Sequence, residues 1–265
     1  MYDLNKINEC LNTKIIGRTI IQYDFLSSTA TKAKSIFNTC PEGLIVLSEN
    51  QSNCAMRMGN EWQCVPDKNI YLSIILKPLV NNLLISKIDA MCCSALHKTI
   101  KDLYNIESKI KWPNDTLIND KKVSSIISNY IGKNNNGIII SFGINVNMDN
   151  EDINSNEDIK SISTSLMIET NSIIDRESLI SNLLNNIEVY YNDLIKNNSI
   201  YEVVNICTKY SSIINKEIQI TKKGKKTKRN VFVKGIDEEG CLIVTNDKGN
   251  EEILNPGETI IIYEA

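Results

Sequence analysis

Apolar residues recur along most of the chain in short segments. In some segments they have the spacing of a helix, and in others they form the short runs typical of a strand. Residues 83–104 place apolar side chains at helical spacing, which predicts a helix with one buried face. Shorter apolar runs have the length and composition of β-strands, and they occupy residues 18–25, 44–47, 70–76, 122–127 and 137–146.

Two further helices are predicted from their start signals. Residues 31–37 follow a serine–threonine run that suits a helix cap. Asp175 is an expected N-cap, and apolar residues recur at helical spacing after it as far as Leu194. The acidic, polar residues 149–164 between these elements are expected to form a loop.

The pattern changes near residue 215. Short strands separated by glycines are predicted from there on, at residues 218–220, 231–233, 241–245, 252–254 and 259–263. Such even spacing is typical of a small β-barrel. We therefore expect a large domain over residues 1–213 and a β domain over residues 214–265.

Charge and hydropathy exclude several classes of partner. The net charge of −3 gives no overall attraction to nucleic acid or to an anionic membrane. No apolar run approaches the roughly 20 residues that span a bilayer, and the first residues lack the apolar core of a signal peptide. We expect a cytoplasmic protein that does not bind membranes.

The eight cysteines are spaced unlike those of a metal site or a disulfide framework. There is no Cys-x-x-Cys pair, and the single histidine, His97, has no neighbouring set of ligands. Cys92 and Cys93 lie within the helix predicted at 83–104, where free thiols pack as small apolar groups. The sequence therefore predicts reduced cysteines, and a solvated or core-edge position for His97 in preference to a catalytic one.

The densest chemistry lies in the segment KWPND at residues 111–115, which Lys122 follows after seven positions. Its proline fixes φ and keeps Trp112 out of the helical region, so the amide and carboxylate lie on a stiff strand end or turn. These groups can bind Mg²⁺ and phosphate or ribose oxygens, and the lysines can neutralise phosphate. Taken alone, the segment is more typical of a charged surface turn beside a strand.

Six strings keep the order in which they occur in biotin protein ligases, and the chain resembles that family from residue 14 onwards. The strings are Ser28-Thr29, residues 43–51, residues 62–78, KWPND with Lys122, residues 143–147, and the strands with the glycines after residue 234. The resemblance implies an α+β fold, with a mixed or antiparallel sheet and helices like those of class II synthetases. It also implies that the small C-terminal β-barrel is SH3-like.

The resemblance further implies a ligase that works in two steps. Biotin attacks the α-phosphate of ATP in the presence of Mg²⁺, which gives biotinyl-5′-adenylate and pyrophosphate. A lysine on the biotin carboxyl-carrier domain of a biotin-dependent carboxylase then attacks the mixed anhydride. The enzyme has to stabilise charge on phosphate and keep water away from the adenylate.

Each site residue takes its role from the same resemblance. Arg57 and Lys122 are the expected catalytic cations, and Asp115 is the expected Mg²⁺ ligand. The expected biotin contacts are Ser28, Thr29, Gln51, Arg57 and Lys122. The expected ATP contacts are Arg57, Trp62, Lys111, Asn114, Asp115, Lys122 and Asn145.

Plainer roles are open for several of these residues. Ser28 and Thr29 suit a helix cap, and Trp62 suits core packing. Asn145 suits a turn, and Arg57 suits a solvated loop.

The pocket strings also depart from the family's pattern. Its Gly-Arg-Gly-Arg-x-Gly-Arg loop is replaced by residues 54–60, in which Arg57 is the one arginine. Two of its glycines are replaced by Ser125 and Ser141, an asparagine by Ala30 and a glutamate by Asn129. We therefore expect reduced activity. The alternative is a divergent paralogue that adenylates another carboxylic acid, or that binds biotin or nucleotide without turnover as a regulatory protein.

Two further features bear on macromolecular partners. About 16 residues precede the first predicted strand, too few for the helix-turn-helix that some family members carry, so no DNA binding is expected. The basic run at 222–229, centred on Gly224, predicts a solvated hairpin. Its functional alternative is contact with an acidic carrier domain or with phosphate, and binding of nucleic acid is a weaker alternative. Homodimerisation through the large sheet is implied by the family alone.

Overall fold

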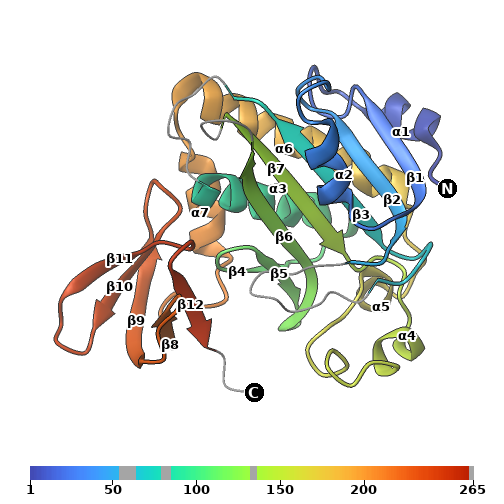
Figure 1. Cartoon of the computed structure of the whole chain (residues 1–265). Coiled ribbons are helices and arrows are strands. Elements are labelled where there is room, and N and C mark those ends of the chain that lie inside the picture. Colours follow the sequence, from blue (N-terminus) through green and yellow to red (C-terminus); the bar gives the residue numbers. More distant parts are fainter. Residues whose placement is uncertain (54–63, 79–84, 132–135, 263–265) are drawn as a thin grey trace.

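The computed structural model describes residues 1–53, 64–78, 85–131 and 136–262. Their larger part is built on a seven-stranded sheet with the order β1-β2-β3-β7-β6-β5-β4 (Figure 1). The strands are β1 (Ile20–Leu26), β2 (Ile45–Gln51), β3 (Ile70–Leu76), β4 (Lys109–Lys111), β5 (Asp115–Ile118), β6 (Lys121–Ile131) and β7 (Gly137–Ile144). β1 and β2 are parallel and the other neighbours are antiparallel, so the expected mixed sheet is confirmed.

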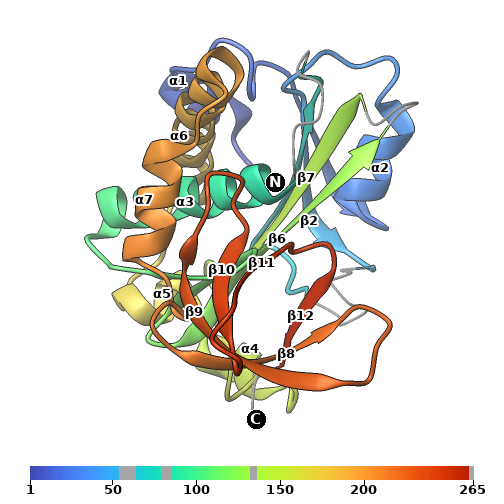
Figure 2. The same cartoon turned by 90° about the vertical axis from the view of Figure 1, so that its left-hand side faces the viewer.

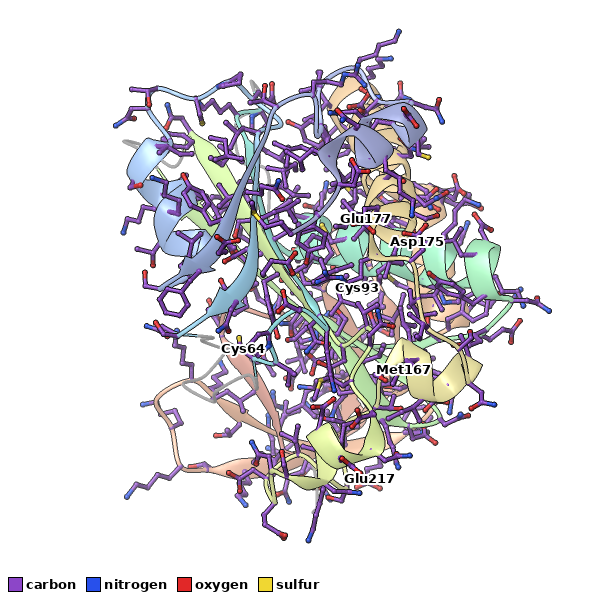
Figure 3. The ribbon with its side chains drawn as sticks, turned by 90° about the vertical axis from the view of Figure 1, so that its right-hand side faces the viewer. Cys64, Cys93, Met167, Asp175, Glu177 and Glu217 are labelled. Atoms are coloured by element: carbon purple, nitrogen blue, oxygen red, sulfur yellow. The ribbon has the colours of Figure 1, made fainter. Side chains whose placement is uncertain are left out.

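Helices cover the two faces of this sheet unequally. Figure 2 shows α3, α6 and α7 on one side of the sheet and α2 on the other. Asp175 caps α6 as predicted, and Asp175 and Glu177 lie at the amino end of that helix (Figure 3). The helices are α1 (Leu4–Cys10), α2 (Thr29–Ile36), α3 (Ile85–Tyr104), α4 (Asn150–Asn154), α5 (Leu166–Thr170), α6 (Arg176–Asn197) and α7 (Tyr201–Lys209).

Side chains alternate between the two faces of the sheet along each strand, and this alternation gives each face its own apolar cluster. Successive side chains of a strand point to opposite faces, so Ile140 and Phe142 of β7 join the large core beneath α3 and α6, while Ile139 joins a smaller cluster under α2. That smaller cluster includes Ala33 and Phe37 and covers one end of the sheet. Beyond it, the α2 side of the sheet carries polar side chains, which are described below.

The C-terminal strands form a second sheet, which is antiparallel and five-stranded with the order β11-β10-β9-β8-β12. It lies beside the large sheet in Figure 1. Gly224, at φ +77°, lies in the turn that joins β8 to β9, so the basic run forms the predicted hairpin. The strands are β8 (Glu217–Lys222), β9 (Lys228–Ile236), β10 (Leu242–Asn246), β11 (Glu251–Leu254) and β12 (Thr259–Ile262).

A turn of the second sheet contacts the large sheet's layer directly. The indole Nε1 of Trp112 donates a buried hydrogen bond to the carbonyl of Gly240 at 3.0 Å. Glu239 accepts a hydrogen bond from the Ser86 hydroxyl on its carbonyl, and its carboxylate pairs with Lys87 at 2.8 Å. The two sheets are thus joined at the segment that leads into Asp115.

The cysteine prediction was wrong at one position. Cys64 is disulfide-bonded. Spacing rules recognise metal-type pairs, whereas a disulfide needs only two Cα atoms within about 7 Å, which chain folding can supply at any spacing. Among the residues that the structure covers, Cys93 lies in the interior on α3 (Figure 3), and the free cysteines are Cys10, Cys40, Cys92, Cys93, Cys207 and Cys241.

The described part of the chain also bears on metals and membranes. It contains no group of three His, Cys, Asp or Glu side chains that could hold a metal ion. Nor does any helix in the described ranges combine the length and the apolar character that a membrane span requires.

Candidate functional site

A row of small polar side chains crosses the α2 side of the sheet beyond the apolar cluster. Ser73 of β3 pairs with Ser141 of β7, and Gly143 of β7 pairs with Ser125 of β6. Ser125 in turn pairs with Asp115 of β5. Directly paired residues of antiparallel strands share a face, so these five residues form one continuous surface, here called the polar floor.

Helix α2 begins at one end of the polar floor. Ser28 is its N-cap and accepts from the Thr31 amide at 3.5 Å. Thr29 is buried; its backbone N–H donates to Oε1 of Gln51 at 2.6 Å. The sequence-predicted residues Ser28, Thr29 and Gln51 therefore lie together.

Two floor residues extend this group. The Ser73 hydroxyl donates to Oγ1 of Thr29 at 2.8 Å, and it lies 2.8 Å from the hydroxyl of Ser141. Thr29, Ser73 and Ser141 are called the hydroxyl chain below. Because these residues come from one helix and two strands, sequence order alone gives no sign that they meet.

The opposite end of the polar floor is charged. Nζ of Lys122 lies 2.6 Å from Oδ2 of Asp115, and both side chains are largely buried, with 18% and 16% of their surfaces exposed. Ser125 donates to the other oxygen of Asp115, also at 2.6 Å. The predicted residues Lys122 and Asp115 are thus brought together, with Ser125 as a third member.

Lys111 adds a second cation to this end. Lys111 of β4 lies directly opposite Asp115 of β5 in the antiparallel register of the two strands. Burial lowers the pKa of Lys111, while the charge of Asp115 raises that pKa and the charge of Lys122 lowers it. Two lysines around one carboxylate carry a net positive charge, which favours binding of a carboxylate or a phosphate.

A β-bulge explains why Lys122 and Ser125 share a face although they are three residues apart. Leu117 pairs with Lys122 and Thr116 pairs with Ser124, so Val123 of β6 has no counterpart on β5. In an unbroken strand, residues three apart point to opposite faces. The extra residue reverses this alternation and turns Lys122 toward the polar floor.

The KWPND segment forms the tight connection from β4 to β5 that its proline predicts. The Trp112–Pro113 peptide bond is cis. The Asn114 side chain is buried and donates to the carbonyl of Ile126, whose own amide donates to the Asn114 carbonyl at 2.9 Å. The Asn114 amide nitrogen therefore fixes the turn against β6.

The other residues that the sequence analysis singled out lie in different surroundings. Asn145 is buried just beyond β7 and donates from Nδ2 to the carbonyl of Thr164 at 3.0 Å. Ala30 packs against the apolar cluster under α2, and Asn129 is exposed on β6. Arg57 and Trp62 lie outside the described residues.

The site residues fit Mg²⁺ as a partial ligand set. Asp115 offers one carboxylate whose two oxygens already accept hydrogen bonds from Ser125 and Lys122. Mg²⁺ usually keeps several waters and binds through one or two carboxylates together with substrate phosphates. Asp115 therefore suits an ion that arrives with a nucleotide.

Comparison with known proteins finds a family model that matches the part of the chain holding this site. Residues 23–147 match the model of the biotin/lipoate A/B protein ligase family, and that range includes both ends of the polar floor. Over these residues the chain is similar to this family. Its α+β architecture, with the C-terminal β-sheet, is that of biotin ligases.

The chain is similar to two curated proteins over part of their length. The bifunctional ligase/repressor BirA of Bacillus subtilis is 32% identical over 145 residues, which are 54% of this chain and 45% of that protein. Biotin–protein ligase 2 of Arabidopsis thaliana is 28% identical over 159 residues, which are 57% and 46% of the two chains. The matched part of the chain thus spans less than half the length of these relatives.

The fold likeness reaches further along the chain. The structure of the biotin protein ligase from Aquifex aeolicus in complex with biotin and ATP has a TM-score of 0.80 at 21% identity. The match covers 93% of this chain and 100% of that chain, so it reaches into the C-terminal sheet.

Proposed function

We propose that the protein is an ATP-dependent biotin protein ligase. The observation that carries this proposal is the polar floor itself. It has hydrogen-bonding hydroxyls at the Thr29 end and the Lys111–Lys122 pair of cations at the Asp115 end. Biotin has the matching polarity, with a cyclic urea at one end and a carboxylate at the other.

The Thr29 end suits the urea. Hydroxyl groups both donate and accept, and a urea offers N–H donors and a carbonyl acceptor. Ser28, Thr29 and Gln51 lie together there and are the proposed contacts.

The Asp115 end suits the reacting anions. We assign Lys122 to the biotin carboxylate and the α-phosphate, and Lys111, Asn114, Asp115 and Asn145 to the nucleotide with its Mg²⁺. Arg57 and Trp62 are assigned to the same nucleotide from the sequence string that contains them. Fixed cations aimed at developing phosphate charge are worth more in a buried site than in water.

The first step joins a carboxylate oxygen of biotin to the α-phosphorus and breaks the bond from that phosphorus to the bridging oxygen. Pyrophosphate leaves with the electron pair. In the second step the amine of a carrier-domain lysine bonds to the acyl carbon and loses a proton, while AMP leaves. Lys122 can balance charge in both steps because AMP and pyrophosphate are both anionic leaving groups.

A second candidate function follows from the polar floor. Ser125 and Ser141 carry hydroxymethyl side chains where the family's pattern has glycine. These side chains take up space above the sheet and make the polar floor more polar. The alternative is adenylation of another carboxylic acid, or binding without turnover. The carrier domain of a biotin-dependent carboxylase is the proposed acceptor for the first candidate only.

Pyrophosphate release with ATP, Mg²⁺ and biotin tests the proposal. We expect biotin-dependent release that Lys122→Ala lowers by roughly 100-fold, since a buried cation at the reacting phosphate is lost. Lys121→Ala is the matched control, because Lys121 is the exposed neighbour on the same strand. Binding of biotin or ATP without pyrophosphate release would contradict the ligase proposal and favour the second candidate.

A further inference from the structure

Ser125 lies at the charged end of the polar floor. It is uncharged, so its residue type alone does not predict a role beside Asp115 and Lys122. The Ser125 hydroxyl donates to Oδ1 of Asp115 at 2.6 Å. The other carboxylate oxygen, Oδ2, lies 2.6 Å from Nζ of Lys122. One carboxylate thus bridges the two residues, with one oxygen for each.

The backbone fixes this bridge on both sides. Ser125 is paired directly with Asp115 across β6 and β5. The bulge at Val123 places Lys122 on the same face. Ser125 is 5% exposed, so its hydroxyl is shielded from competing water.

The hydroxyl restricts how the carboxylate can turn. A carboxylate with one partner can rotate about its Cβ–Cγ bond, and a second charge-assisted hydrogen bond holds its plane. Lysine carries its ammonium group on a flexible four-carbon stem, so the position of Nζ depends on what it pairs with. Fixing Asp115 therefore fixes Nζ of Lys122.

We propose that Ser125 is a positioning residue for Lys122 and acts through Asp115, without touching the substrate acid. The inference rests on the proposed adenylation of biotin. It assigns the serine that replaces a family glycine to the orientation of the main cation. Residues 54–60, which replace the family's arginine-rich loop, contain Arg57 as their one arginine. More of the charge stabilisation therefore depends on where Lys122 is placed.

The first test compares two neighbouring serines. Ser125→Ala should lower kcat/KM for biotin in pyrophosphate release by about tenfold, since small displacements of a catalytic group are costly. Ser125→Thr keeps the hydroxyl and should stay within about threefold of the wild type. Ser124→Ala is the matched control: Ser124 is also buried, but it donates to the carbonyl of Gly143 from the opposite face of β6.

A double-mutant cycle shows whether the effect passes through Asp115. In an Asp115→Asn background, Ser125→Ala should change kcat/KM by less than about twofold, because the group that Ser125 orients is already altered. The dissociation constant of biotin, measured by calorimetry for the same four proteins, gives the cycle again if Asp115→Asn turns over too slowly.

Two results would overturn the inference. One is an equal loss from Ser125→Ala in the wild-type and the Asp115→Asn backgrounds, which would mean that Ser125 acts on the substrate itself. The other is an equal loss from Ser124→Ala, which would mean a general effect on the sheet. Failure of the wild-type protein to release pyrophosphate would instead overturn the proposed function.

Discussion

His97 is the single histidine of the chain, and its surroundings explain why it does not belong to the candidate site. It is 4% exposed on α3, and its Nδ1 lies 3.0 Å from both the carbonyl and the hydroxyl of Ser108. Its ring packs 3.9 Å from the ring of Tyr210. Burial lowers the pKa of His97 from its ordinary value of 6.5.

This burial makes stability depend on pH. The unfolded chain binds a proton at His97 near pH 6.5, while the folded protein binds it at lower pH, so stability is full above that value and falls as the pH drops below it. We expect the free energy of unfolding to decrease between about pH 7.5 and pH 5.5. Urea unfolding at both values should show a smaller decrease for His97→Asn, and equal decreases would contradict the assignment.

At the same scale, the sequence predicts which residue types form the candidate site better than it predicts their contacts. The order of motifs indicates Ser28, Thr29 and Gln51 as a group, and the structure places them together. The sequence marks Ser125 only as the replacement of a family glycine and Ser73 only as part of the string at residues 62–78, and it indicates the contacts of neither. Both act through pairing between strands, and the pairing of Ser125 depends on a bulge that no residue pattern marks.

Among the helices, α6 holds the start of the chain in place through one carboxylate. Glu188 is buried and accepts hydrogen bonds from three consecutive backbone amides, those of Lys14, Ile15 and Ile16. These amides lie between α1 and β1, where no regular element satisfies them. The side chain of one helix therefore supplies the acceptors that a sheet would otherwise provide.

Removing this carboxylate should destabilise the fold. Glu188→Ala leaves the buried amide of Ile16 and the partly buried amides of Lys14 and Ile15 without this acceptor, and we expect the free energy of unfolding to fall by about 2 kcal/mol, since an unsatisfied buried group costs about 1–3 kcal/mol. Val189→Ala, at the exposed next position of α6, is the control and should change it by less than about 0.5 kcal/mol. Equal changes in urea unfolding would show that the amides find other partners.

Long periodic elements could be predicted from the sequence, and short ones could not. The spacing at 83–104 corresponds to α3, and the pattern after Asp175 corresponds to α6. Residues 149–164, expected to be a loop, contain the five-residue helix α4, which is held by a capping box between Asp149 and Asp152. A helix of this length is too short to show a period, so its end groups decide its structure.

At the scale of the whole molecule, one turn of the second sheet makes hydrogen bonds to the larger part of the protein. Gly240, in this turn, accepts the indole hydrogen bond of Trp112 and has φ +76°. A Cβ atom at Gly240 would lie 2.7 Å from the carbonyl oxygen of Ser86. The turn therefore requires glycine both for its backbone angle and for its contact.

Gly249 separates these two requirements. It has φ +79°, and a Cβ there would meet nothing within 4 Å. Both Gly240→Ala and Gly249→Ala incur the left-handed penalty of about 1–2 kcal/mol, so only their difference reports the contact between the sheets. We expect Gly240→Ala to be less stable and to exchange the Trp112 indole hydrogen faster; indistinguishable exchange would mean that the turn does not hold the sheets together.

The hydroxyl chain has a direction. A hydroxyl has a single hydrogen, and Ser73 gives its hydrogen to Thr29, so Ser141 must be the donor toward Ser73. Within the described part of the protein the Thr29 hydroxyl donates to no other residue, so its hydrogen is left for a group beyond Ser73 and Ser141. A urea carbonyl can take that hydrogen and the hydrocarbon end of a fatty acid cannot, so the order of donation among three uncharged side chains favours one class of acid over the other.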